Sequence, residues 1–217
     1  MPISIEIADN HNLTISGKID RVDCYESEEG NFVRIVDYKS GHKEFDLSQM
    51  AEGLNLQMLL YLFAIWRTDN DKYSNVSPAG ILYMPVGNPT PNLDRGEEDK
   101  EQKNYVMSGL LLSDNRVLCA MEKDLGGKYL PIYQKKEELK GKHLATMEEF
   151  KAIEKYTKEL VLLMGKGLLS GNIAPDPIMT GQNPPCVYCE YNAVCGRELT
   201  EPCRTVTKRT MEDIVNA

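Results

Sequence analysis

The chain lacks any hydrophobic run long enough to cross a membrane, which takes about 18–20 consecutive apolar residues. Its first residues also lack the basic and apolar stretches of a secretory signal peptide. Positive charge is scarce as well, because 25 Lys and Arg stand against 33 Asp and Glu, a net charge of −8. This balance argues against a protein that coats nucleic acid with its whole surface. Local positive charge would still suffice for an enzyme that acts on DNA.

Cysteine, in contrast, is present six times. In a chain without a secretory signal, we expect these cysteines to be thiols or metal ligands rather than a disulfide framework, and we expect the protein in the cytoplasm. The 217 residues suit one domain with an appendage. We divide them into a core over residues 1–172 and a cysteine-containing segment with a tail over residues 173–217.

The first 39 residues predict three successive strands, over residues 3–7, 13–25 and 31–39. Turn-forming residues separate them at 9–12 and 28–31, so an antiparallel meander is expected. Cys24 and Cys119 stand among apolar residues and are predicted to be buried thiols.

A buried helix is predicted over residues 47–66, with Asp46 or Ser48 as its cap. A strand over residues 79–86 follows it. Because strands flank a long helix, the sequence predicts an α/β core with at least one crossover.

A second long helix is predicted from Thr146, where a capping-box pattern occurs, to the region of residues 165–171. Its core-facing positions are Phe150, Ile153, Leu160 and Met164. Between the helices we expect a mobile loop over residues 87–103, an irregular apolar stretch with a strand or a short helix over 105–119, and an edge strand over 130–135.

Two charged side chains follow an apolar strand where Asp37 and Lys39 flank Tyr38. A strand has a period of two, so Asp37 and Lys39 point to one face, and Asp20 on the neighbouring strand adds a second carboxylate. Two carboxylates with the Tyr38 carbonyl could hold Mg²⁺ or Mn²⁺, and Lys39 could then orient an attacking water or stabilise developing charge. The alternative is a salt bridge between adjacent strands.

Asp23 competes with Asp20 as the second carboxylate, but strand alternation places Asp23 on the opposite face, so we prefer Asp20. Gln57 and Tyr61 lie four residues apart on one face of the first predicted helix. Gln57 could bond a phosphate or a base, and Tyr61 could bond the backbone or stack, although such a pair is also common in purely structural roles.

The third group is a C-x2-C-x5-C pattern formed by Cys186, Cys189 and Cys195 after two prolines. This spacing is typical of metal binding. Three thiolates do not complete a four-ligand zinc or iron–sulfur site. Cys203 is close enough in sequence to be the fourth ligand, and so is a residue outside this chain.

Taken in order, these motifs resemble the RecB-like nucleases of the PD-(D/E)XK superfamily. The resemblance runs through residues 17–23, 37–41 and 57–61. With residues 45–47, residues 53–54 and the terminal cysteines, the chain is most similar to the C-terminal nuclease domain of the AddB/RexB component of AddAB-type (RexAB-type) helicase–nucleases. The ordered set covers most of the chain and is more specific than any single motif.

The resemblance implies a restriction-endonuclease-like α/β fold, with a mixed sheet flanked by helices. It implies Asp20 and Asp37 as metal ligands, Lys39 as the catalytic lysine, and Gln57 with Tyr61 as the family's Q-x3-Y motif.

The resemblance also implies that Cys186, Cys189 and Cys195 bind a 4Fe–4S cluster whose fourth cysteine lies upstream. Family members carry an upstream helix with a metal-binding His or acidic residue as well. Only 16 residues precede Gly17, and neither feature is visible among them. We therefore expect a fragment of a longer protein, in which the nuclease site and the cluster are completed upstream.

These observations lead to one main hypothesis: a Mg²⁺-dependent exodeoxyribonuclease module acting in double-strand-break repair and recombination. It would hydrolyse a single-stranded DNA end delivered by an AddA/RexA-type helicase–nuclease subunit. A second hypothesis is a stand-alone iron–sulfur nuclease of the CRISPR-associated type. A third is a non-catalytic module that docks DNA or a protein partner.

Overall fold

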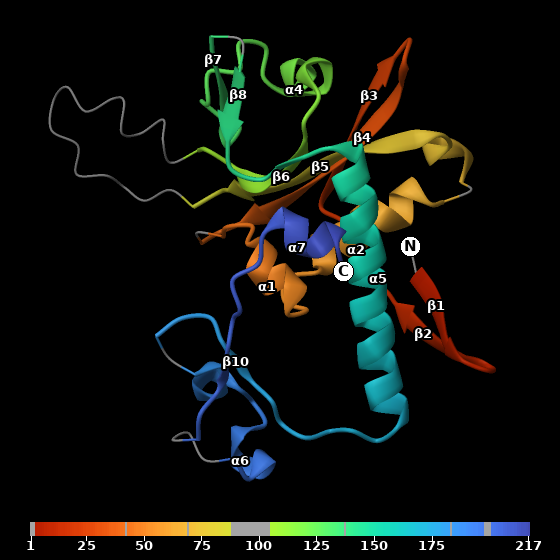
Figure 1. Cartoon of the computed structure of the whole chain (residues 1–217), viewed down its shortest axis with the longest axis vertical. Helices are drawn as coiled ribbons and strands as arrows, with labels where there is room; N and C mark the ends of the chain where they lie inside the picture. Colours follow the sequence, from red (N-terminus) through yellow and green to blue (C-terminus); the bar gives the residue numbers. More distant parts are fainter. Residues whose placement is uncertain are drawn as a thin grey trace, which may run out of the picture.

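A computed structural model of the chain describes residues 3–41, 43–68, 70–87, 105–136, 138–182, 184–197 and 201–217. Figure 1 shows a sheet across the upper half of the molecule and the long helix α5 (Met147–Leu169) running down from it. The elements that carry the terminal cysteines lie below the sheet in this view, and α5 separates them from the β1–β2 hairpin. The mixed α/β class predicted from the sequence is confirmed.

The central sheet has five strands in the order β3-β4-β5-β6-β9. The strands β3 (Arg21–Ser27) and β4 (Gly30–Lys39) form an antiparallel hairpin, whereas β4 and β5 (Val76–Pro85) run parallel. The strand β6 (Ser108–Leu112) is antiparallel to β5, and β9 (Leu144–Ala145) completes the sheet. A parallel pair needs a crossover connection, and helices between β4 and β5 provide it, as the sequence predicts.

Strand β4 contributes apolar side chains to both faces of the sheet. Ile35 belongs to the larger core, beneath α2 (Gln57–Trp66), and Val36 belongs to a second core on the opposite face. Because side chains alternate along a strand, Asp37 and Lys39 point to the same face as Ile35. The charged end of β4 therefore lies on the face that α2 covers.

The prediction of one continuous helix over residues 47–66 is wrong, because this segment forms two helices, α1 (Leu47–Ala51) and α2. Gly53 and Asn55 adopt left-handed conformations between the two, with φ of 85° and 58°. Asp46 caps α1 as predicted, with its Oδ1 accepting two backbone N–H groups at 2.8 and 3.1 Å. The break lets α2 begin as a separate helix over the sheet.

A charged contact ties α2 to α5. Arg67 donates from Nε (2.7 Å) and Nη2 (2.5 Å) to the two carboxylate oxygens of Glu154. The same guanidinium lies 4.0 Å from the centre of the Trp66 ring. A second link is the hydrogen bond from the Tyr156 hydroxyl to the Ala51 carbonyl of α1. These contacts fix both crossover helices against α5.

Helix α5 begins with the predicted capping box at Thr146. Phe150 and Ile153 are buried as predicted, but Met164 is 44% exposed, so its assignment to the core is wrong. Gly165 takes the inward position instead, since a side chain there would meet the β1–β2 hairpin. Neither α5 nor any other helix of the described residues is long and apolar enough to span a membrane.

The prediction of one continuous strand over residues 13–25 is wrong. Strand β2 (His11–Ile15) pairs only with β1 (Ile3–Ala8), and residues 16–20 leave strand conformation before β3. The reason is tertiary, because Gly17 in this stretch packs against a tyrosine of α2. The expected meander is therefore two separate antiparallel hairpins.

The stretch predicted as irregular over residues 105–119 contains β6 and most of α4 (Asn115–Met121). The predicted edge strand is β7 (Ile132–Lys135), which pairs with β8 (Glu138–Gly141) outside the central sheet. All but the first residue of the loop predicted at 87–103 lie outside the described residues. A single 3-10 turn, η1 (Asp71–Tyr73), precedes β5.

Cys24 and Cys119 are both exposed, so the prediction that they are buried thiols is wrong. Cys24 lies on the edge strand β3, and Cys119 lies on α4, whose buried residues are Val117 and Leu118. Apolar neighbours in sequence did not translate into burial at either position.

The terminal cysteines lie in a segment of short elements, residues 173–203, which we call the cysteine segment. Its neck is a parallel pair between β10 (Ile178–Met179) and β11 (Arg204–Thr205). Between them lie η2 (Pro185–Tyr188) and α6 (Asn192–Cys195). This neck separates the segment from the sheet, as Figure 1 shows.

The chain then returns to the core through residues 204–215, which we call the C-terminal strap. Arg204 at its start donates to Glu52 at 3.0 Å, directly after α1. The strap ends in α7 (Met211–Val215), whose Ile214 is 2% exposed and belongs to the larger core. The strap thus packs against the crossover helices, although it follows the cysteine segment.

Glu122, after α4, organises the loop that leads to β7. Its carboxylate accepts the backbone N–H groups of Lys128 (2.9 Å), Tyr129 (3.0 Å) and Leu130 (2.8 Å). Burial raises the pKa of Glu122, but these backbone hydrogen bonds outweigh burial and leave the pKa below its usual 4.5. The ionised form therefore stabilises the folded state.

We expect Glu122→Gln to lower the free energy of unfolding by about 1 kcal/mol at neutral pH, because the amide keeps only one of two acceptor oxygens. A lowered pKa contributes stability that is present above pH 4.5 and is lost as the pH falls through the folded-state pKa. The difference between parent and variant should therefore shrink below that pH in urea unfolding curves. A difference that stayed constant down to pH 3 would contradict this account, and Glu190→Gln, at an exposed position, is the control.

Candidate active site

The end of β4 carries a carboxylate and an ammonium in contact. Lys39 Nζ lies 2.5 Å from Asp37 Oδ2, and the two side chains are 36% and 13% exposed. Despite this short distance, Asp37 Oδ2 is buried and receives no hydrogen bond of acceptable geometry from the described residues. The contact is therefore an ion pair and not a well-directed hydrogen bond.

Asp20 joins this pair from the residue before β3. Its Oδ2 accepts the backbone N–H of Tyr38 at 3.3 Å, which places the Asp20 carboxylate beside the peptide bond between Asp37 and Tyr38. Asp20 is exposed, and no cationic side chain pairs with it among the described residues. The salt bridge between adjacent strands that the sequence allows is thus not formed, since Lys39 pairs within its own strand.

Asp23 is occupied elsewhere. It accepts Arg21 Nε at 2.7 Å from its own strand β3, and Arg34 Nε at 2.9 Å from the directly opposite position on β4. Burial raises the pKa of Asp23, but the two arginines outweigh it and hold the pKa below its usual value. Arg34 Nη1 is itself buried without a partner among the described residues. The two arginines leave Asp23 little capacity to ligate a metal ion, in line with the preference for Asp20.

The predicted pair on α2 is joined by a hydrogen bond and contacts the segment that leads to Asp20. Gln57 Nε2 donates to the Tyr61 hydroxyl at 3.0 Å, with Gln57 exposed and Tyr61 buried. Gly17 packs against the same hydroxyl so closely that a Cβ there would lie 1.9 Å from it. The tyrosine therefore holds both the amide of Gln57 and the backbone that leads to Asp20.

Tyr83 is a neighbour of the site that the sequence did not reveal. It lies beside Asp37 in the parallel register of β4 and β5 and is 4% exposed. Burial and, secondarily, the negative charge of Asp37 raise the pKa of Tyr83 to about 12. Tyr83 therefore stays neutral and forms one wall of the carboxylate's environment. Only the strand pairing brings it there, so no local sequence signal could have found it.

Lys43 is the second neighbour that sequence reasoning missed. Its Nζ donates to Asn55 Oδ1 at 2.5 Å, and Asn55 Nδ2 donates to Gln49 Oε1 at 2.8 Å. Burial, then the positive charge of Lys39, lower the pKa of Lys43, while Asp37 opposes the shift. A lysine soon after the Asp37–Lys39 strand was the only available signal.

The donor set at the strand end fits a divalent cation. Asp37 offers a buried oxygen without a hydrogen bond, and Asp20 offers a second carboxylate nearby. Across the described residues, no group of three His, Cys, Asp or Glu side chains could hold a metal ion. Backbone carbonyl, water and phosphate oxygens are further ligands that such an ion accepts.

The cysteines of the predicted cluster are not brought together as a three-ligand set within the described part of the cysteine segment. Cys186 and Cys189 are joined through a backbone hydrogen bond of 3.2 Å, and Cys195 ends α6. Arg197 Nη1 donates to Cys186 Sγ at 3.6 Å. All six cysteines are free thiols, so the donor chemistry fits a metal centre, while the described arrangement does not form one.

The mixed sheet thus brings Asp20, from the residue before β3, to Asp37 and Lys39 at the end of β4. The model of the PD-(D/E)XK nuclease superfamily matches residues 1–196, so the chain belongs to that superfamily. Nucleases of this superfamily generally use divalent metal ions.

Among curated proteins, the chain is similar to the B subunits of ATP-dependent helicase/deoxyribonucleases from three bacteria. It is 36% identical to that of Acetivibrio thermocellus over 92% of this chain, 33% to that of Thermoanaerobacter sp. strain X514 over 89%, and 36% to that of Alkaliphilus oremlandii over 89%. In each case, the matched region is 18% of the relative's length. The chain therefore spans less than a fifth of these relatives.

Gly17→Ala should displace Tyr61 and with it Gln57, because the new Cβ would overlap the hydroxyl. We expect nuclease activity of the full-length polypeptide to fall about 10- to 100-fold, as misplacement by an ångström does at other active sites. The matched control is Gly41→Ala, where a Cβ meets nothing within 4 Å. Equal activity of the two variants in a DNA cleavage assay would show that the Gly17–Tyr61 contact does not position the site.

Proposed function

We propose that this chain is the nuclease module of a helicase–nuclease complex and hydrolyses phosphodiester bonds of single-stranded DNA as an exonuclease. The observation that carries the proposal is the meeting of Asp20, Asp37 and Lys39 at the end of β4, where a buried Asp37 oxygen receives no well-directed hydrogen bond from the described residues. Membership of the nuclease superfamily supports the reaction class. The names of the relatives support DNA as substrate and a helicase subunit as partner.

In this proposal, Asp20 and Asp37 hold Mg²⁺ or Mn²⁺, together with the Tyr38 carbonyl. Such an ion would supply an activated water at neutral pH and would neutralise charge on the phosphate. Asp37 keeps Lys39 positioned through their ion pair, and Lys39 presents its remaining N–H donors to the water or the phosphate oxygens. Gln57, held by Tyr61, donates to the DNA from the N-terminus of α2.

The partner in this proposal is an AddA/RexA-type helicase–nuclease subunit that delivers a single-stranded DNA end during double-strand-break repair. A cytoplasmic location suits six free thiols. Cys186, Cys189 and Cys195 bind a 4Fe–4S cluster together with a cysteine from outside this chain. We assign the cluster a role in holding the cysteine segment, and none in hydrolysis.

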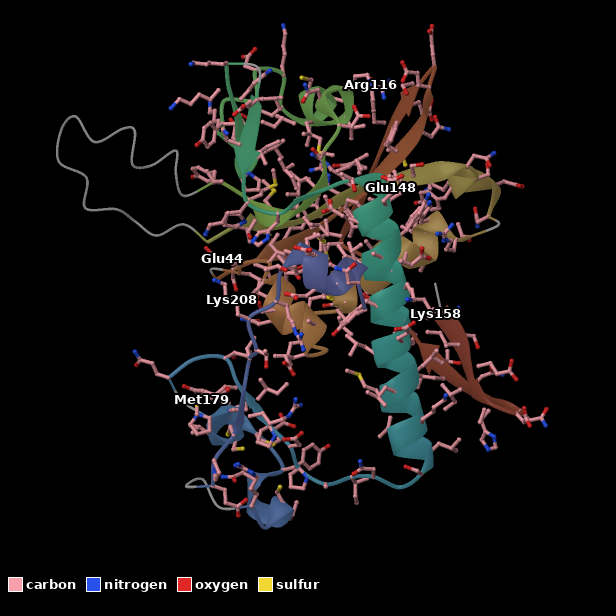
Figure 2. All side chains as sticks on the ribbon, viewed as in Figure 1. Glu44, Arg116, Glu148, Lys158, Met179 and Lys208 are labelled. Atoms are coloured by element: carbon pink, nitrogen blue, oxygen red, sulfur yellow. The ribbon has the colours of Figure 1, made fainter. Side chains whose placement is uncertain are left out.

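The decisive test is cleavage of end-labelled single-stranded DNA by the full-length polypeptide in its natural complex, with Mg²⁺. Lys39→Ala and Asp37→Asn should each lower the cleavage rate by about 100-fold or more, as the removal of one charge-stabilising group does elsewhere. The matched control is Lys158→Ala on α5, which Figure 2 labels away from the strand end.

Two outcomes would contradict the proposal. Cleavage by Lys39→Ala at the parental rate would remove Lys39 from the reaction. DNA binding without any cleavage by the parent, in Mg²⁺ or Mn²⁺, would favour the non-catalytic docking module instead.

The cluster assignment predicts iron and acid-labile sulfide in the full-length protein purified without oxygen. Cys186→Ser, Cys189→Ser or Cys195→Ser should each remove most of both, since a missing thiolate leaves the cluster incompletely ligated. Cys119→Ser, an exposed thiol on α4, should leave the content unchanged. Zinc in place of iron and sulfide would replace the cluster with a structural zinc site.

A further inference from the structure

Lys43 lies at the nuclease centre but takes no part in the mechanism above. It follows Lys39 by four residues, and its ammonium reaches Asn55, the residue two before Gln57 and α2. Asn55 has a φ of 58°, and its amide is held by Gln49 of α1 at 2.8 Å. Figure 2 labels the adjacent Glu44 at the edge of the molecule below the sheet, where this segment lies. The crossover thus holds Lys43 on the side of the strand end that faces α1.

No carboxylate of the described residues forms an ion pair with Lys43. The residue is half-buried. Asp37, the negative group that acts on it, is already paired with Lys39. Two lysines therefore share one carboxylate in a partly desolvated place, where like charges repel each other.

Most of the hydrogen-bonding capacity of Lys43 is also unused. An ammonium has three N–H donors, and Asn55 is the only acceptor found for Lys43 in the described part of the chain. Asn55 is neutral, so it fixes the position of the ammonium without neutralising it. A lysine that served packing alone would extend its ammonium into water, whereas this one is held by an amide that is itself held. An anion bound beside Lys43 would take up both the charge and the free donors.

We propose that Lys43 is a second phosphate-binding group of the nuclease centre. It contacts a non-bridging oxygen of a phosphate that flanks the scissile one on a single strand, while Asn55 and Gln49 keep its ammonium in place. This inference rests on the proposed nuclease function, because it takes the bound anion to be the substrate backbone. Lys39 acts on the reacting phosphate, and Lys43 acts on strand binding.

The test is binding and cleavage of a short single-stranded oligonucleotide by the full-length polypeptide in its natural complex, without ATP. Binding is measured with Ca²⁺ over a range of salt concentrations. Lys43→Ala should weaken binding several-fold and reduce the slope of log K against log salt by about 0.7, the value for one phosphate contact on a single strand. With Mg²⁺, the same variant should raise KM several-fold and change kcat by less.

Asn55→Asp is the matched variant, because it keeps the size of the side chain and gives Lys43 a carboxylate partner. An intramolecular ion pair would compete with the DNA phosphate, so we expect the same loss of salt slope as in Lys43→Ala. Lys43→Arg should retain most of the slope. If Lys43 were only structural, Asn55→Asp would leave KM and the salt slope at the parental values.

The two proposals can fail separately. Parental salt slopes and KM in Lys43→Ala and Asn55→Asp, with cleavage abolished in Lys39→Ala, would overturn the role of Lys43 alone. Parental cleavage in Lys39→Ala would overturn the nuclease assignment itself. Lys158→Ala again serves as the control for the loss of one positive charge remote from the strand end.

Discussion

The parallel pairing of β4 with β5 is the constraint on which the rest of the structure depends. Parallel neighbours cannot be joined by a tight turn, so the chain must cross over one face of the sheet before β5 begins. The crossover is α1 and α2, and α2 covers the face to which Asp37 and Lys39 point. The same pairing sets Tyr83 directly beside Asp37. One topological requirement thus brings together the Asp37–Lys39 ion pair, helix α2 above it and Tyr83 beside it.

Desolvation gives this arrangement its chemical character. Asp37 sits where β4 leaves the core, next to Ile35 and Tyr83, so its carboxylate is largely removed from water. A buried carboxylate is costly unless it is paired or bound to a metal ion. Lys39 provides the pairing but no well-directed hydrogen bond. The structure therefore holds a strong ligand oxygen incompletely satisfied, which is the condition under which a hard cation binds.

The features that the sequence predicts well are those that depend on a few neighbouring residues. The period of a strand places Asp37 with Lys39, Asp46 caps α1, and the capping box starts α5. The predictions that fail depend on residues far apart in sequence. The strand expected over residues 13–25 is interrupted because Gly17 meets Tyr61 of α2, and no local pattern carries that contact.

The same distinction between local and long-range contacts applies to the residues of the candidate site. Its members on one strand or one helix can be identified from spacing, and strand alternation favours Asp20 over Asp23. Tyr83 could not be found, since its place depends on the β4–β5 register. Lys43 could not be found either, because its hydrogen bond to Asn55 requires the left-handed break between α1 and α2. A helix predicted as continuous removes that break, and with it the cradle of the second lysine.

The break also connects the site to the far end of the chain. The C-terminal strap leaves the neck of the cysteine segment, pairs through Arg204 with Glu52, and bonds to Ser48 of α1 through the backbone of Arg209. Helix α1 carries Gln49, which holds Asn55, which in turn holds Lys43. The strap is therefore linked to the Lys43 ammonium through one short helix and the amide side chains of Gln49 and Asn55. The C-terminal strap and Lys43 are therefore supported by the same short helix, so the chain that follows the cysteine segment is physically linked to the candidate site.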